Sequence, residues 1–141
     1  KIARIFSVYG ENMKRFFIYD IIKKILDTDD TVILNGSGKQ IRDYLHVSDV
    51  AKGMQLILKN GKQGEIYNIC SGEPISLNAL ALKIKNIMQK DFTDIHWNKY
   101  ASKGQRDIWY GDNSKIKSLG FTYKKLDNEI SSVVNSIIKN F

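Results

Sequence analysis

Short extended runs alternate with helically periodic segments along this chain, and this alternation limits the possible folds more than any other feature. Strands are expected where branched and aromatic residues cluster, at residues 2–8, 31–34, 41–47, 65–70 and 95–100. Helices are expected where apolar residues recur at helical spacing, at residues 14–27, 48–59, 77–88 and 127–140. Asp112 and Gly120 bracket a further short helix. Strands that alternate with helices predict an α/β fold with mixed strand pairing.

Two of the expected strands, residues 2–8 and 65–70, are almost continuously apolar. Runs of this kind are typical of strands that are buried in a larger parallel sheet. Neither run has an obvious parallel neighbour in the sequence, so we expect the neighbouring strands to lie upstream, outside it. The chain also opens directly on strand-like sequence without an initiating Met. We therefore expect this sequence to be cut from a longer protein.

Charge and composition rank the possible partners. The 141 residues include 22 basic and 15 acidic side chains, which gives a net charge of +7. The lysines are scattered, as on solvated helix faces, and form no basic stripe interleaved with aromatic residues. A basic nucleic-acid-binding domain is therefore a lower-ranked alternative, and we expect no nucleic-acid partner. No apolar run approaches the roughly 18 residues that span a bilayer, so we expect no membrane association.

Few side chains in this sequence offer catalytic chemistry. His46 and His96 have no zinc-site spacing, and Cys70 is the single cysteine, so no metal site is expected. Cys70 is predicted to be a buried small hydrophobe in a reducing compartment, which favours the cytoplasm. His46 is predicted to be a buried, hydrogen-bonded structural residue. Tyr19 and Lys23 match the Tyr-x-x-x-Lys spacing of some dehydrogenases, but such a short match arises often by chance in a lysine-rich chain.

The arginines are a better guide to a binding site, because only four occur among many lysines. Arg42 follows a two-glycine turn and precedes a helix start signal at Ser48 and Asp49. Arg106 lies in a polar segment, residues 101–111. The planar guanidinium suits bidentate phosphate recognition, so the two arginines could clamp a diphosphate. The alternative for Arg42 is a structural contact, either a salt bridge to the neighbouring Asp43 or an interaction with a helix C-terminus.

Four sequence blocks, in this order, resemble the C-terminal half of the extended short-chain dehydrogenases/reductases, the NAD(P)-dependent nucleotide-sugar epimerase/dehydratase family. The first is Arg-Ile-Phe-Ser-Val-Tyr-Gly at residues 4–10, and the second runs from Val32 to Asp49 through Gly-Ser-Gly-Lys-Gln-Ile-Arg-Asp-Tyr-Leu-His-Val. The third runs from Gly64 to Ser76 and begins Gly-Glu-Ile-Tyr-Asn-Ile-Cys, and the fourth runs from Gly111 to Phe121 and begins Gly-Asp-Asn-Ser-Lys. The resemblance covers nearly the whole chain.

This resemblance implies an incomplete Rossmann-type fragment joined to the smaller mixed α/β substrate-binding domain of that family. Residues 1–141 would be the C-terminal, nucleotide-sugar-binding portion, with residues 1–10 and 65–72 as strands of the truncated Rossmann sheet. The family's NAD or NADP loop and catalytic tyrosine would lie upstream. We therefore expect no catalytic, cofactor-binding or metal-binding residues here, and a chain that is inactive by itself. The intact enzyme would be a homodimer that makes sugars for surface polysaccharides.

The resemblance also assigns substrate-binding residues. Arg42 would contact the diphosphate of a nucleotide sugar, and Val32, Ile33 and Asn35 would pack against or hydrogen-bond the base. Ser7 stands where the family often has an asparagine that touches the diphosphate or the sugar. These assignments predict a nucleoside-diphosphate sugar as the partner.

The second phosphate-binding arginine of the family aligns with Ser102, next to Lys103. Arg106 could supply that charge only if its loop were rearranged. A self-standing nucleotide- or sugar-binding module without catalysis remains an alternative to the enzyme.

Overall fold

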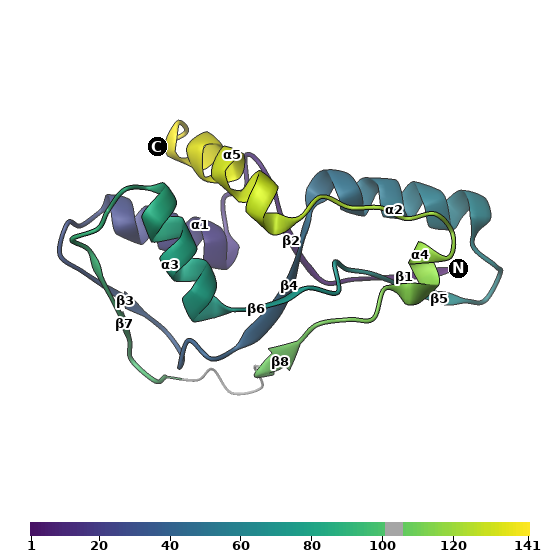
Figure 1. Cartoon of the computed structure of the whole chain (residues 1–141), viewed down its shortest axis with the longest axis horizontal. Helices are drawn as coiled ribbons and strands as arrows, with labels where there is room; N and C mark the ends of the chain where they lie inside the picture. Colours follow the sequence, from purple (N-terminus) through teal and green to yellow (C-terminus); the bar gives the residue numbers. More distant parts are fainter. Residues whose placement is uncertain (101–105) are drawn as a thin grey trace.

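A computed structural model describes residues 1–100 and 106–141 of the chain, and it shows an elongated α/β arrangement (Figure 1). In chain order its elements are β1 (Ile2–Ile5), β2 (Ser7–Tyr9), α1 (Phe16–Leu26), β3 (Thr31–Leu34), β4 (Ile41–His46), α2 (Val47–Asn60), β5 (Ile66–Ile69), β6 (Pro74–Ser76), α3 (Leu77–Ile87), β7 (Asp94–Trp97), β8 (Ile108–Trp109), α4 (Ser114–Lys117) and α5 (Leu126–Ile138). The predicted α/β class with mixed pairing is confirmed.

Strand pairing is distributed over small sheets. Strand β1 pairs in parallel with β5, and β3 pairs in parallel with β7. Strand β4 is shared: its last residues pair in parallel with β2, whereas its first residues pair antiparallel with β6 and parallel with β8. Because β4 runs between the two ends of the molecule (Figure 1), residues on it can connect both.

One core lies at the end of the molecule that contains α1, α3 and α5, which we call the cleft end. The three helices pack against one another and turn their apolar faces toward strands β3 and β4. The fully buried side chains there include Ile18, Ile21, Ile22, Ile25, Leu80, Ala81, Ile84, Val133 and Val134. These are the periodic positions of three predicted helices, so the amphipathic pattern alone placed this core.

A second, smaller core lies at the other end, which contains β1, β5, α2 and α4 and which we call the strand end. Its buried side chains pack together beside α2 and include Leu45, Ile57, Tyr67, Ile69 and Ile116. Strand β1, by contrast, is exposed along its whole length. The strand end therefore has a core on one side of β5 and open apolar surface around β1.

The expected strand at residues 2–8 is in fact two strands that separate at Phe6 and pair with different partners, β5 and β4. The prediction that residues 2–8 and 65–70 lack parallel neighbours in this chain was wrong, because β1 and β5 are parallel neighbours of each other. Their register, which brings Ile2 opposite Ile66, depends on a pairing across a long sequence separation that local pattern does not reveal.

The start of α2 also differs from the prediction. The helix was expected to begin at Ser48 and Asp49, but its N-cap is His46, whose ring nitrogen Nδ1 accepts a hydrogen bond from the Ser48 backbone N–H at 3.3 Å. Asp49 is buried and instead accepts from the Lys124 backbone N–H at 2.9 Å. A tertiary contact has taken the side chain that local capping rules assign to the helix start.

Two short strands were missed. Strand β6 is not among the strands expected from the sequence, and its last residue, Ser76, caps α3 by accepting from the Ala79 N–H. Strand β8 lies within the polar segment 101–111, where no strand was expected; residues 101–105 of that segment fall outside the described residues. Both strands are formed by pairing with β4, which their own sequences do not indicate.

Candidate functional site

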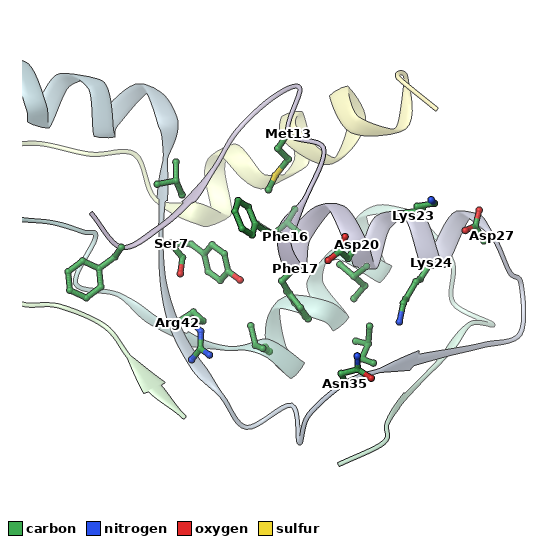
Figure 2. A pocket seen from close by; sticks show the side chains of 17 residues that line it. Ser7, Met13, Phe16, Phe17, Asp20, Lys23, Lys24, Asp27, Asn35 and Arg42 are labelled. Atoms are coloured by element: carbon green, nitrogen blue, oxygen red, sulfur yellow. The ribbon is translucent and has the colours of Figure 1, made fainter. Parts of the chain in front are cut away.

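A cleft with a volume of about 960 Å³ lies at the cleft end, between α1, β2, β4 and the end of β3 (Figure 2). Aromatic and aliphatic side chains form its walls. Its polar lining is Ser7, Asp20, Lys23, Lys24, Asp27, Asn35, Arg42 and Tyr44. Apolar walls with a few convergent polar groups are the usual composition of a small-molecule site.

Arg42 projects into this cleft from β4 and is held by backbone oxygens. Its NH1 atom donates to the carbonyl of Ile41 at 2.7 Å and reaches the carbonyl of Asp107 at 3.4 Å. Asp107 immediately precedes β8, which pairs with β4 at Arg42. The β8 pairing therefore fixes the guanidinium at the edge of the cleft.

The alternative partner of Arg42, the neighbouring Asp43, points the other way. Asp43 is completely buried and accepts hydrogen bonds from the backbone N–H groups of Ser71 and Gly72, each at 2.8 Å. The Ser71 hydroxyl donates to it as well, at 2.7 Å. Successive residues of a strand face opposite sides, so Arg42 faces the cleft while Asp43 joins β4 to the segment after β5.

Ser7 and Asn35 lie on the cleft from two other segments. Ser7 begins β2, which pairs with β4 so that Ser7 lies opposite Tyr44. Asn35 follows β3, and its side-chain oxygen accepts from the Asn98 amide at 2.7 Å. The structure thus brings together Arg42, Ser7 and Asn35, three of the side chains that the sequence nominated separately (Figure 2).

Val32 and Ile33 are placed differently. The Val32 side chain is 2% exposed and belongs to the core, so only its backbone could contact a ligand. The Ile33 side chain is 57% exposed, and its backbone carbonyl accepts a hydrogen bond from Lys24 at 2.6 Å. Side-chain alternation along β3 explains the difference, because odd and even positions face opposite sides.

Arg106 is not among the side chains that line the cleft. Its guanidinium lies over the ring of Trp109, 5.6 Å from the ring centre, and Trp109 in turn contacts Phe6. The structure therefore does not form the two-arginine clamp considered from the sequence. Ser102 and Lys103, the alternative positions for the second phosphate contact, lie outside the described residues.

The other residues that the sequence analysis considered for catalysis make contacts typical of structural residues. His46 is 5% exposed, its ring contacts Tyr9 edge-on, and its two nitrogens bond Glu11 at 3.1 Å and the Ser48 hydroxyl at 2.7 Å. Its predicted structural role is confirmed. Tyr19 is a helix residue whose ring stacks on Phe141. Cys70 is fully buried, as predicted.

Several residues of the cleft were missed from the sequence. Phe17 stacks on Trp97 with an interplanar angle of 14°, which makes one wall, and Phe16 lies exposed at the rim. Tyr44 is 8% exposed, and burial raises the pKa of its phenol, so the hydroxyl stays protonated. Lys24 was counted as an ordinary solvated lysine. The available signal was the position of Phe16 and Lys24 on the helix that directly precedes β3, the strand that the resemblance assigns to the base.

Comparisons with known proteins indicate the family of this chain. Residues 1–70 match the model of the NAD dependent epimerase/dehydratase family. The dTDP-D-glucose 4,6-dehydratase of Mus musculus is 29% identical over 146 aligned positions, which cover 99% of this chain and 41% of that protein. The chain belongs to the NAD-dependent epimerase/dehydratase family. It spans less than half the length of the curated relatives it matches.

Solved structures of this family share the fold. A UDP-glucose 4-epimerase from Thermotoga maritima, solved with UDP-glucose, is 26% identical with a TM-score of 0.84, over 98% of this chain and 45% of that one. A UDP-glucuronic acid 4-epimerase from Bacillus cereus, solved with UDP-glucuronic acid and NAD, has a TM-score of 0.87 at 24% identity, over 99% of this chain and 45% of that one. The predicted Rossmann-type relationship is confirmed at the level of the fold.

The described residues do not offer the cradle that the family's dinucleotide requires. A dinucleotide pyrophosphate needs a glycine-rich turn that leads from a strand into a helix N-terminus. The turn that contains Gly36 and Gly38 leads from β3 into strand β4 instead. Residues 1–100 and 106–141 also contain no cluster of three or more metal-ligating side chains, and no helix among them is long and apolar enough to cross a bilayer.

Proposed function

We propose that this chain is the nucleotide-sugar-binding part of an NAD(P)-dependent epimerase, dehydratase or reductase. The observation that carries the proposal is the convergence of Arg42, Ser7 and Asn35, from three separate segments, on one apolar-walled cleft. Those residues are the ones expected at the diphosphate, the sugar and the base. Their position on one cavity supports a site in which a single ligand could contact all three.

The chemistry of the cleft suits a nucleoside diphosphate. A diphosphate needs a fixed, planar donor, and the Arg42 guanidinium is fixed because carbonyls of Ile41 and Asp107 hold its NH1 atom. The apolar surfaces of Phe17 and Leu34 line the same cleft and could pack against base and ribose. Arg42 would thus orient the ligand, while the walls exclude water from it.

The remaining chemistry would come from polypeptide outside this sequence. We propose that residues 1–10 and 65–72 contribute strands to a larger Rossmann sheet, whose other half holds NAD or NADP and the catalytic tyrosine. That cofactor, when bound there, would take up and return a hydride at the sugar ring. In this proposal the chain alone binds nucleotide sugar without turning it over. The intact enzyme would be a cytoplasmic homodimer that supplies sugars for surface polysaccharides.

The experiment is a calorimetric titration of the chain with UDP-, dTDP-, GDP- and CDP-sugars. We expect saturable binding of at least one of them, weakened at least about tenfold in Arg42→Ala because a charged hydrogen-bond donor is lost. Arg4→Ala is the matched control, since Arg4 lies on exposed β1, where it reaches Asn68. Binding that Arg42→Ala leaves intact, or no binding at all, would overturn the proposal.

A further inference from the structure

Lys24 lines one end of the cleft, and its side chain is held by a hydrogen bond to a neighbouring strand. Its ammonium crosses from α1 to β3 and donates to the Ile33 backbone carbonyl at 2.6 Å. Figure 2 shows its side chain extending toward Asn35, whereas the side chain of the neighbouring Lys23 extends the opposite way. An ammonium carries three donors and no acceptor, so this anchored group keeps donors for a ligand in the cleft.

The base of the nucleotide would lie at the Lys24 end of the cleft; this placement rests on the proposed function. Arg42 and Ser7 are on the opposite side of the cleft from Lys24 and Asn35 (Figure 2). The sugar must point toward β2 and the proposed Rossmann sheet, where hydride transfer would take place. With the diphosphate at Arg42, the base is then directed toward Asn35 and Lys24.

We propose that Lys24 makes the cleft selective for bases that carry a carbonyl oxygen at pyrimidine position 4 or purine position 6, namely uracil, thymine or guanine, over cytosine and adenine, which carry an amino group there. Uracil and thymine carry an acceptor oxygen at the position where cytosine carries an amino donor. A fixed ammonium can donate to that oxygen but meets the amino group donor to donor. A site that hydrogen-bonds one particular ligand group discriminates strongly against an analogue that cannot form that hydrogen bond.

Two carboxylates, those of Asp20 and Asp27, also line this region. Because a carboxylate accepts hydrogen bonds, they would favour bases that carry an amino group. Both are exposed residues of the helix surface or its C-cap, Asp27 being the C-cap of α1. Lys24 differs from them because its hydrogen bond to β3 fixes the ammonium at the cleft. A positioned donor contributes more to recognition than a solvated, mobile acceptor, so the donor decides the preference.

The test uses UDP and CDP, which share ribose, diphosphate and ring size and differ in the oxygen or amino group at one ring position. Calorimetry would measure the dissociation constants of both for the unaltered chain, for Lys24→Met and for Lys59→Met; Lys59 lies exposed on α2, at the strand end. We expect UDP to bind at least about tenfold more tightly than CDP. Lys24→Met should bring that ratio close to one, whereas Lys59→Met, with the same loss of charge, should keep it.

Equal affinity for UDP and CDP in the unaltered chain would overturn the role of Lys24 while leaving the proposed nucleotide site intact. A ratio that survives in Lys24→Met would overturn it too, and so would a ratio that falls as far in Lys59→Met, because overall charge would then explain the preference. If neither nucleotide binds the unaltered chain, the proposed function itself fails, which separates the two outcomes.

Discussion

The cleft end and the strand end differ in how the sheet strands in each are covered by helices. At the cleft end α1, α3 and α5 shield one another, and Ile22, Leu80 and Ile84 have no exposed surface, while Phe16 and Ile33 are exposed beside the cleft. At the strand end Ile2 is 54% exposed and Leu58 is 76% exposed. An apolar groove of about 470 Å³ also runs there, lined by residues of β1 and α2.

This difference shows where the chain leaves a sheet uncovered. Parallel strands are normally covered on both faces, whereas β1 and β5 are covered by the smaller core on one face only. At the cleft end the helices form a closed core next to the cleft. The geometry of the cleft therefore depends on contacts that the described residues make with one another.

The largest expected effect tests the closed core directly. Leu80→Ala should lower the free energy of unfolding by about 2–5 kcal/mol, because it leaves a cavity among packed helices. Leu58→Ala, the same change on an exposed helix face, should alter it by no more than about 0.5 kcal/mol. Urea unfolding followed by circular dichroism would measure both. Comparable losses for the two variants would contradict the contrast between the two ends.

An intermediate effect is expected at the connection between the ends. Asp43→Asn places an amide donor among the N–H groups of Ser71 and Gly72 that the carboxylate now accepts. We expect a loss of about 1–3 kcal/mol in unfolding free energy, with a fall in ligand affinity because β4 also carries Arg42. Asp94→Asn, on exposed β7, is the control. Full stability in Asp43→Asn would mean that the two ends are joined by packing alone.

The smallest effect is expected on the surface of the strand end, where the Lys115 ammonium binds the Glu65 carboxylate. This hydrogen bond lowers the pKa of Glu65 below its ordinary value of 4.5. Because the folded pKa is the lower one, the pair stabilises the fold above that value and loses its contribution as the pH falls through the folded pKa. Exposure keeps the contribution small.

The measurement is an NMR titration of the Glu65 carboxyl group in the unaltered chain, in Lys115→Met and in Lys117→Met. Lys115→Met should return the pKa toward 4.5, and Lys117→Met, also on α4, should leave it lowered. A large fall in stability in Lys115→Met would show that ion pairs, rather than the small core, hold the strand end together.

Helix positions could be read from the sequence because they depend on local periodicity. The stripes of α1, α3 and α5 gave nearly the observed bounds, since each buries one face against the same core. The pairing of β1 with β5 could not be read, because it joins segments about sixty residues apart by backbone hydrogen bonds that carry no sequence signal. The start of α2 was misplaced because Asp49 serves a distant backbone group.

The features of the candidate site also fall into those that the sequence predicts and those that depend on the tertiary structure. The sequence by itself determined the residue types that could meet a diphosphate, and it singled out Arg42 because arginine is rare in a lysine-rich chain. Only the tertiary structure decided that Arg42, Ser7 and Asn35 share one cleft, that Arg106 stacks on Trp109, and that Lys24 reaches β3. The physical reason is that the donor or acceptor groups of a side chain follow from its residue type alone. Whether two side chains lie close together depends on strand pairing and helix packing between distant segments.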